Sequence, residues 1–175
     1  MKILVVSDTH GHDENLMRVL QREWPIDALI HCGDLEGSED YIPEAVECPC
    51  FFVRGNNDFS AICQRKKYSV WQNYRIMVTH GHMYGVSLST CQLEEEARSR
   101  QVQVVMFGHT HYPYLDEEED LTVLNPGSLS YPRQPGRKPS YLVMQIDEQG
   151  KAHYEHRYLE KSWKNKGKIR KIKKN

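Results

Sequence analysis

The stretch KILVVSDTH (residues 2–10) places an apolar, strand-like run directly before two residues of metal-binding type, Asp8 and His10. Four later patches repeat this arrangement after strand-like runs, and each of the four carries a glycine that lets the backbone turn sharply. The five patches are Asp8-Thr9-His10, Gly33-Asp34, Gly55-Asn56-Asn57-Asp58, His80-Gly81-His82 and Gly108-His109-Thr110-His111. In an α/β protein with a mainly parallel sheet, the loops beyond the carboxyl ends of the strands converge. We therefore expect the five patches to meet at one site.

The side chains in these patches are aspartate, histidine and asparagine, which offer oxygen and nitrogen ligands. This mixture suits manganese, iron, nickel or zinc better than calcium or a zinc ion held by thiolates. One patch alone is weak evidence, because an aspartate near a histidine often serves only to orient it. Five patches in order, each at the end of a strand, predict a dinuclear hydrolytic centre.

The length of 175 residues fits one domain with a core of its own. The formal net charge is -1, so no strong overall field selects nucleic acid or a membrane as partner. The charge is unevenly distributed, because residues 161–175 hold eight Lys or Arg and no acid. We expect a single domain over residues 1–160 and a basic tail over residues 161–175.

The five cysteines are odd in number and form no C-x-x-C framework, which favours reduced thiols inside a cell. The first apolar run, Ile3 to Val6, is too short for a signal peptide, and no stretch has membrane-spanning length. The sequence therefore predicts a cytoplasmic location.

The pattern of elements changes along the chain. In the first part, a helix capped by Asp13 and ended by Pro25 joins two strands as a β-α-β unit. Further expected elements are a short helix or loop at 37–46, a hairpin of 67–71 and 74–79, a helix at 88–100, and strands at 112–115, 121–124, 141–146 and 153–158. This α/β pattern predicts two mixed β-sheets packed as a sandwich, with helices on the outer faces.

The ordered patches resemble the signature of the calcineurin-like metallophosphoesterases. The short length and the segment Asn125-Pro126-Gly127-Ser128 resemble its small bacterial and archaeal phosphodiesterase branch, of the YfcE type. The resemblance covers residues 1–159. It implies a four-layer αββα fold and a phosphoric ester hydrolase that acts on a small phosphodiester.

The resemblance also implies which residues bind the two ions. Asp8, His10 and His111 would hold one metal, and Asn56, His80 and His109 would hold the other. Asp34 would bridge both. The expected ions are Mn²⁺, with Zn²⁺, Ni²⁺ or Fe²⁺ as alternatives. A bridging hydroxide would attack the phosphorus in line.

The chain departs from the family pattern at Asn57. Members with broad phosphomonoesterase activity usually have a histidine there, and an asparagine cannot donate a proton to a leaving group at pH 7. Diesters with good leaving groups are therefore the expected substrates. His12 and His82 are alternative proton donors or exposed loop residues.

Two further catalytic candidates lie at the third patch. Arg54 either contacts the substrate phosphate or pairs with an acid at the end of its strand. Asp58 is a candidate because it belongs to the same patch. The turn at 125–128 is expected to shape the wall of the site, because a turn places backbone donors near an anion. His31, inside a strand, is expected to be a packed or supporting histidine rather than a ligand.

Two alternatives stay open. The retromer subunit Vps29 resembles this family yet binds protein partners, so a non-catalytic scaffold is one of them, although all seven ligand positions here carry competent donors. An RNA-directed phosphoesterase that uses the basic tail is the other, but the tail has a single aromatic residue, Trp163, for stacking. Nucleic acid is therefore not favoured as a partner, and a homo-oligomer is left open.

Overall fold

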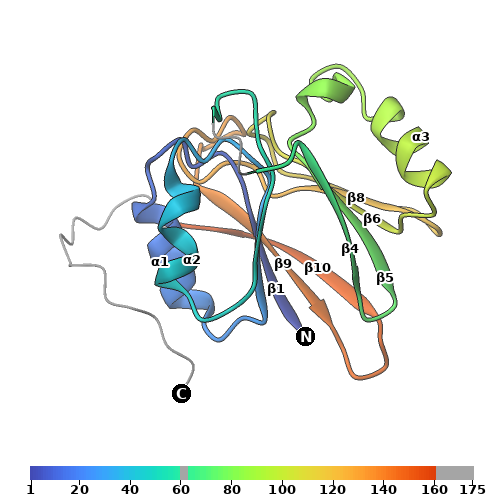
Figure 1. The fold of residues 1–175 in the computed structure, drawn as a ribbon, viewed down its shortest axis with the longest axis horizontal. Coiled ribbons are helices and arrows are strands. Elements are labelled where there is room, and N and C mark those ends of the chain that lie inside the picture. The colour runs from blue at the N-terminus through green and yellow to red at the C-terminus, as the bar shows by residue number, and fades with distance from the viewer. Residues whose placement is uncertain (60–62, 161–175) are drawn as a thin grey trace.

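The computed structural model describes residues 1–59 and 63–160 (Figure 1). The basic tail predicted at 161–175 lies outside these residues. Two five-stranded sheets form the centre of the fold, with strand orders β10-β9-β1-β2-β3 and β4-β5-β6-β8-β7. Both sheets are mixed, because β1, β2 and β3 run parallel and so do β5, β6 and β8, whereas β9, β10, β4 and β7 pair in antiparallel fashion.

The strands and helices have the following bounds. The first sheet contains β1 (Lys2–Val6), β2 (Ala28–His31), β3 (Cys50–Phe52), β9 (Ser140–Ile146) and β10 (Ala152–Tyr158). The second sheet contains β4 (Lys66–Trp71), β5 (Tyr74–Thr79), β6 (Val104–Met106), β7 (Tyr114–Glu117) and β8 (Thr122–Asn125). The helices are α1 (Glu14–Glu23), α2 (Ile42–Ala45) and α3 (Cys91–Ser99), with short 3-10 helices η1 (Ser38–Asp40) and η2 (His82–Tyr84).

The alternating direction of the side chains along β1 explains why both faces of the first sheet are covered. Ile3 and Val5 belong to the cluster between the two sheets, whereas Leu4 and Val6 belong to a separate cluster with Leu20 of α1. Since successive side chains of a strand point to opposite faces, burial of both faces requires the continuous apolar run seen in the sequence.

The second sheet is covered in the same way. Met77 of β5 and Val105 of β6 pack with Leu93 and Ala97 of α3, while Val104 packs between the sheets. Three apolar layers therefore separate four structural layers. In Figure 1, α1 and α3 lie on opposite sides of the two sheets. The expected αββα sandwich is confirmed.

Some local expectations were wrong. Asp13 occupies the N-cap position of α1 but makes no side-chain capping bond there. Its carboxylate instead accepts hydrogen bonds from Ser38 and Tyr41, which ties the segment before α2 to the start of α1. The strand expected at 112–115 is shifted along the chain, because β7 spans Tyr114–Glu117. Within the described residues, no helix is long and apolar enough to cross a membrane.

Candidate metal centre

The five patches meet at one end of the sandwich. Three follow β1, β2 and β3 of the first sheet, and two follow β5 and β6 of the second. Backbone bonds join the loops within each sheet: the Asp8 N–H donates to Gly33 O at 3.0 Å, and the Gly108 N–H donates to His80 O at 3.1 Å. Between the sheets, the His109 N–H donates to Asp8 Oδ2 at 3.2 Å. The predicted convergence of the patches is therefore present in the structure.

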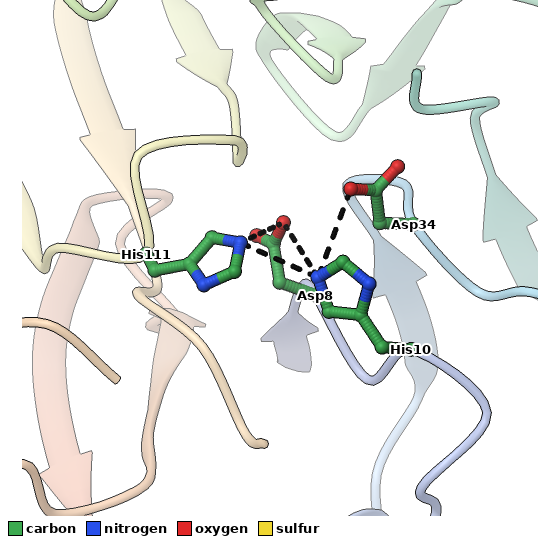
Figure 2. A group of neighbouring side chains, drawn as sticks. All are labelled: Asp8, His10, Asp34 and His111. Atoms are coloured by element: carbon green, nitrogen blue, oxygen red, sulfur yellow. Dashed lines mark hydrogen bonds and ion pairs between the residues drawn. The ribbon is translucent and has the colours of Figure 1, made fainter. Parts of the chain in front are cut away.

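The first cluster contains Asp8, His10, Asp34 and His111, and one ligand atom from each lies within 4.8 Å of all the others (Figure 2). Asp8 Oδ1 lies 3.1 Å from His111 Nε2 and 3.9 Å from His10 Nε2. The two Nε2 atoms are 3.3 Å apart. Figure 2 shows these side chains reaching one point from three separate loops.

The hydrogen-bond partners of the His10 and His111 imidazoles show that several acceptor atoms face one another. His10 Nδ1 lies 2.7 Å from a Glu36 carboxylate oxygen, and His111 Nδ1 lies 2.8 Å from the Tyr131 carbonyl oxygen. Both oxygens can only accept, so each Nδ1 carries its proton. In the neutral rings, the Nε2 lone pairs then face one another and a buried Asp8 Oδ1 that has no hydrogen-bond partner among the described residues. A cation placed among these three acceptors would satisfy all of them.

The second cluster has the same character. His80 Nδ1 donates to Cys32 O at 2.8 Å, which leaves the Nε2 lone pair of His80 facing Asn56 Oδ1 at 3.1 Å. The same Asn56 oxygen lies 3.0 Å from His109 Nδ1. The donor set of two imidazoles, a carbonyl oxygen and a carboxylate fits a divalent transition metal.

Asp34 lies between the two clusters. Its Oδ2 atom is 3.7 Å from His10 Nε2 and 3.5 Å from His80 Nε2, so one oxygen contacts a histidine of each set. Burial opposes ionisation of the carboxyl, but hydrogen bonding and charge from His80, with hydrogen bonds from Asn57, lower the pKa of Asp34 well below its usual value. This side chain is therefore an anion at neutral pH.

The other buried carboxyl of the site is also ionised. Burial alone would raise the pKa of Asp8, but close contact with His111 and the charge of His80 bring the pKa below its ordinary value. For the same reason the pKa of His111 is raised: burial lowers it, and contact with Asp8 more than offsets that effect. Among the described residues, the side chains that can give these two carboxylates a positive partner are thus protonated histidines.

The backbone at the site is strained. Asp8, His10, Asp34, His109 and His111 all have positive φ, between 49° and 69°. Residues with side chains rarely adopt this conformation, and such strain is concentrated at functional sites. Two glycines allow the loops to approach closely: a Cβ on Gly55 would lie 2.0 Å from Asp34 Oδ1, and one on Gly108 would lie 2.1 Å from Ser7 Oγ. The glycines of these patches are thus required by packing.

Asn57 and Asp58 bind protein groups rather than an open pocket. The backbone N–H and the side-chain Nδ2 of Asn57 donate to the two Asp34 oxygens at 2.9 and 2.8 Å. Asp58 is buried and accepts four backbone N–H bonds, from Asp34, Leu35, Glu36 and Gly55, at 2.7 to 2.8 Å. We had expected Asp58 to act in the chemistry, but these contacts favour a role in holding the two loops together.

The remaining candidate histidines differ in exposure. His12 is exposed, with its ring 5.8 Å from that of Tyr131. His82 is half-buried, with ring centroids 5.4 Å from His80 and 6.1 Å from His109. Within the described residues, no hydrogen bond or ion pair links the Arg54 side chain to the first cluster. His31 is fully buried and contacts Thr9 and Gly33 instead, which agrees with a supporting role.

The sequence interpretation missed the residues that orient the ligands. Glu36 lies two positions beyond Asp34, and that spacing could have indicated a partner for a metal-binding histidine. The Tyr131 and Cys32 carbonyls could not be found from sequence, because any residue supplies a carbonyl. Ser128 is fully buried and ties two loops of the site together, because its hydroxyl donates to Asp8 O at 2.9 Å and accepts from the Tyr131 N–H at 2.8 Å.

The fold and the two facing clusters define an α/β protein with a candidate centre for divalent metals. A model of the calcineurin-like phosphoesterase superfamily domain matches residues 1–149. The chain therefore belongs to the calcineurin-like phosphoesterase superfamily, and this membership places it among the phosphoric ester hydrolases.

Individual relatives agree with this membership. The probable metallophosphoesterase YsnB of Bacillus subtilis is 32% identical over 148 residues, which covers 84% of this chain and 85% of YsnB. The phosphodiesterase YfcE of Escherichia coli is 27% identical and covers 84% of this chain and 89% of YfcE. A solved structure of a predicted phosphoesterase from Streptococcus pneumoniae is 27% identical, with a TM-score of 0.73, over 89% of this chain and 97% of that protein.

Vps29 shares the fold as well. The structure of a Vps29 double mutant from Entamoeba histolytica superposes with a TM-score of 0.73 over 91% of this chain and all of that chain, at 21% identity. At this identity the likeness concerns the fold alone. It does not favour a scaffold role over catalysis.

Proposed function

We propose that this protein is a metal-dependent phosphodiesterase with two divalent ions. Asp8, His10 and His111 would hold one ion, Asn56, His80 and His109 the other, and Asp34 would contact both. The observation that carries this proposal is the position of Asp34 Oδ2, within 3.7 Å of an Nε2 atom from each cluster. Two ions in such a site clamp the attacking and leaving oxygens and lower the pKa of a bound water.

Neighbouring residues of the chain would set the tautomers of the histidine ligands. Glu36 and the Tyr131 carbonyl hold the protons of His10 and His111 on Nδ1, which leaves each Nε2 free to bind metal. The Cys32 carbonyl does the same for His80. Nitrogen and oxygen donors without thiolate suit Mn²⁺ first, with Zn²⁺, Ni²⁺ and Fe²⁺ as alternatives.

The proposed substrate is a small phosphodiester with a good leaving group. Asn57 donates hydrogen bonds to Asp34 and has no proton to give at neutral pH. Loss of a general acid costs about two to four orders of magnitude for a poor leaving group, and less for a group that leaves as a stable anion. Alkyl phosphomonoesters should therefore be poor substrates.

A screen after metal reconstitution tests the function. The chain is stripped with a chelator, reloaded with Mn²⁺, and given bis(4-nitrophenyl) phosphate or an alkyl phosphomonoester. We expect hydrolysis of the diester only with metal. Tight metal binding without hydrolysis of any diester would contradict the proposal and favour a scaffold like Vps29.

The variant Asn57→His tests the substrate preference. The new imidazole can donate a proton, so monoester hydrolysis should rise by roughly tenfold or more relative to the diester, with metal content matched. Equal monoester rates in both proteins would show that another group, such as His12 or His82, already supplies the proton.

A further inference from the structure

A hollow of about 660 Å³ opens next to the first cluster, lined by Ser130, Tyr131, Pro132, Arg133 and Arg137. It shares a wall with the candidate metal centre. The Tyr131 ring lies 5.2 Å from the His10 ring and 6.5 Å from the His111 ring. The Arg133 N–H donates to His111 O at 3.0 Å. A molecule bound at the metals would therefore extend readily into this hollow.

The two arginines bring positive charge that the protein does not neutralise. Among the described residues, neither Arg133 nor Arg137 forms an ion pair, and the Arg133 guanidinium contacts only the Thr110 carbonyl, at 3.4 Å. Lys138 in the same loop differs, because it pairs with Glu160 at 2.7 Å. Unpaired guanidinium groups in a concave surface fit a phosphate, which they can bind with paired hydrogen bonds.

Tyr131 adds a flat apolar surface at the same place. Half of its surface is exposed, and its ring meets the His10 and His12 rings edge to face. The exposed part can stack on a planar ring of a ligand. The hollow thus combines a binding surface for a phosphate with one for an aromatic ring.

We propose that this hollow binds the leaving half of a diphosphate diester that carries a planar base, with Arg133 and Arg137 on the second phosphate and Tyr131 against the base. The inference rests on the proposed phosphodiesterase function and deepens it by naming the substrate class. It also agrees with Asn57, because a phosphate monoester leaves as a stable anion without a proton from an acid.

The reaction balances as a simple hydrolysis. Water adds its oxygen to the phosphorus nearer the metal centre, and the bond from that phosphorus to the anhydride oxygen breaks. The anhydride oxygen leaves as part of the second phosphate. The products are two phosphate monoesters, and the protons of the water pass to solvent and to the product phosphates according to their pKa values. No oxidant, reductant or further reactant is required.

Two probes test the subsite with the full chain loaded with Mn²⁺. Diadenosine diphosphate has two phosphates and a base on each side of them, whereas bis(4-nitrophenyl) phosphate has a single phosphate. The double variant R133Q/R137Q should lose kcat/KM for diadenosine diphosphate at least tenfold more than for the nitrophenyl diester, mainly through KM. The control Lys138→Gln, whose charge is already paired, should keep the wild-type ratio between the two probes.

The outcomes separate the subsite from the catalytic function. If wild type cleaves the nitrophenyl diester but not diadenosine diphosphate, or if the double variant keeps the wild-type ratio, the subsite proposal fails while the function stands. If wild type cleaves neither probe, the function fails, and calorimetry of diadenosine diphosphate binding decides the subsite. Binding weakened tenfold or more in R133Q/R137Q but not in Lys138→Gln supports it, and equal binding in all three proteins overturns it.

Discussion

A buried carboxylate lies near each end of β1, and the two differ in how neighbouring residues compensate their charge. At its start, Lys2 and Arg157 lie 3.0 and 2.5 Å from Glu23 Oε2, and the Tyr141 hydroxyl donates to Oε1 at 2.7 Å. Beyond its end, Asp8 faces histidines that can be neutral. Lys2 and Arg157 compensate the charge of Glu23, whereas among the described residues no lysine or arginine pairs with Asp8. Burial of a carboxylate thus indicates a ligand site only when its neighbours leave the charge uncompensated.

The largest expected effect comes from Asp34→Asn. If Asp34 contacts both ions, this change should lower kcat/KM by roughly a thousandfold or more, since several kcal/mol of charge stabilisation would be lost. Metal content, measured by elemental analysis, should fall below two ions per chain. The control Asp120→Asn changes an exposed carboxylate and should alter neither quantity. Two ions and near-normal turnover in Asp34→Asn would refute the bridging role.

The Glu23 cluster should affect stability and not metal binding. Glu23→Gln removes the anion that pairs with Lys2 and the buried one of the two carboxylates that pair with Arg157. We expect this change to lower the free energy of unfolding by about 2–3 kcal/mol, because both cations are partly exposed. Denaturant unfolding measures this. Glu155→Gln removes an exposed partner of Arg157 and should cost less than about 0.5 kcal/mol. Loss of bound metal in Glu23→Gln would show that the two ends of β1 are coupled, contrary to this comparison.

Glu36 tests the residues that orient the ligands. Without its carboxylate, the His10 ring is no longer held with its proton on Nδ1. Glu36→Ala should therefore weaken metal affinity roughly 10- to 100-fold, with less effect on turnover at saturating metal. A competition titration with a fluorescent chelator measures the affinity. Asp40→Ala, a nearby exposed acid, is the control, and an equal affinity in both variants would exclude the proposed role.

The smallest effect is the pH dependence of the Glu23 contribution. Burial raises the pKa of Glu23, but the bonds to Tyr141 and Lys2 and the charge of Arg157 bring it below the usual 4.5. A lowered pKa in the folded state means that the stabilisation is present above pH 4.5 and is lost as pH falls through the folded value. The stability difference between wild type and Glu23→Gln should therefore shrink below about pH 4.5. A difference that grows in acid would contradict the assignment.

The sequence was sufficient for the sandwich and for the convergence of the patches. Apolar runs buried on both faces, followed by polar residues, leave few alternatives for strands such as β1 and β6. The sequence was insufficient where a side chain binds residues that lie far away along the chain. The carboxylate of Asp13 binds Ser38 and Tyr41 instead of capping α1. Glu23 gave no signal at all, because its partners come from β1, β9 and β10.

Within the site, the sequence predicted which residue types lie together but not the role of each residue. Asp58 looked like a catalytic residue because it belongs to a patch of ligands, yet it binds four backbone N–H groups. Short-range spacing cannot distinguish a carboxylate that faces a pocket from one that faces the backbone. The assignment of the seven ligands and the location of the tail in the fold remain predictions.

A crystal structure of the chain grown with Mn²⁺ tests the central claim most directly. Anomalous difference density should show two ions, roughly 3.5 to 4 Å apart, with Asp34 bound to both and with no cysteine sulfur among the ligands. The Glu23 cluster should hold no ion in the same crystal. A single ion, an ion bound to Cys32, or two ions that do not share Asp34 would contradict the account.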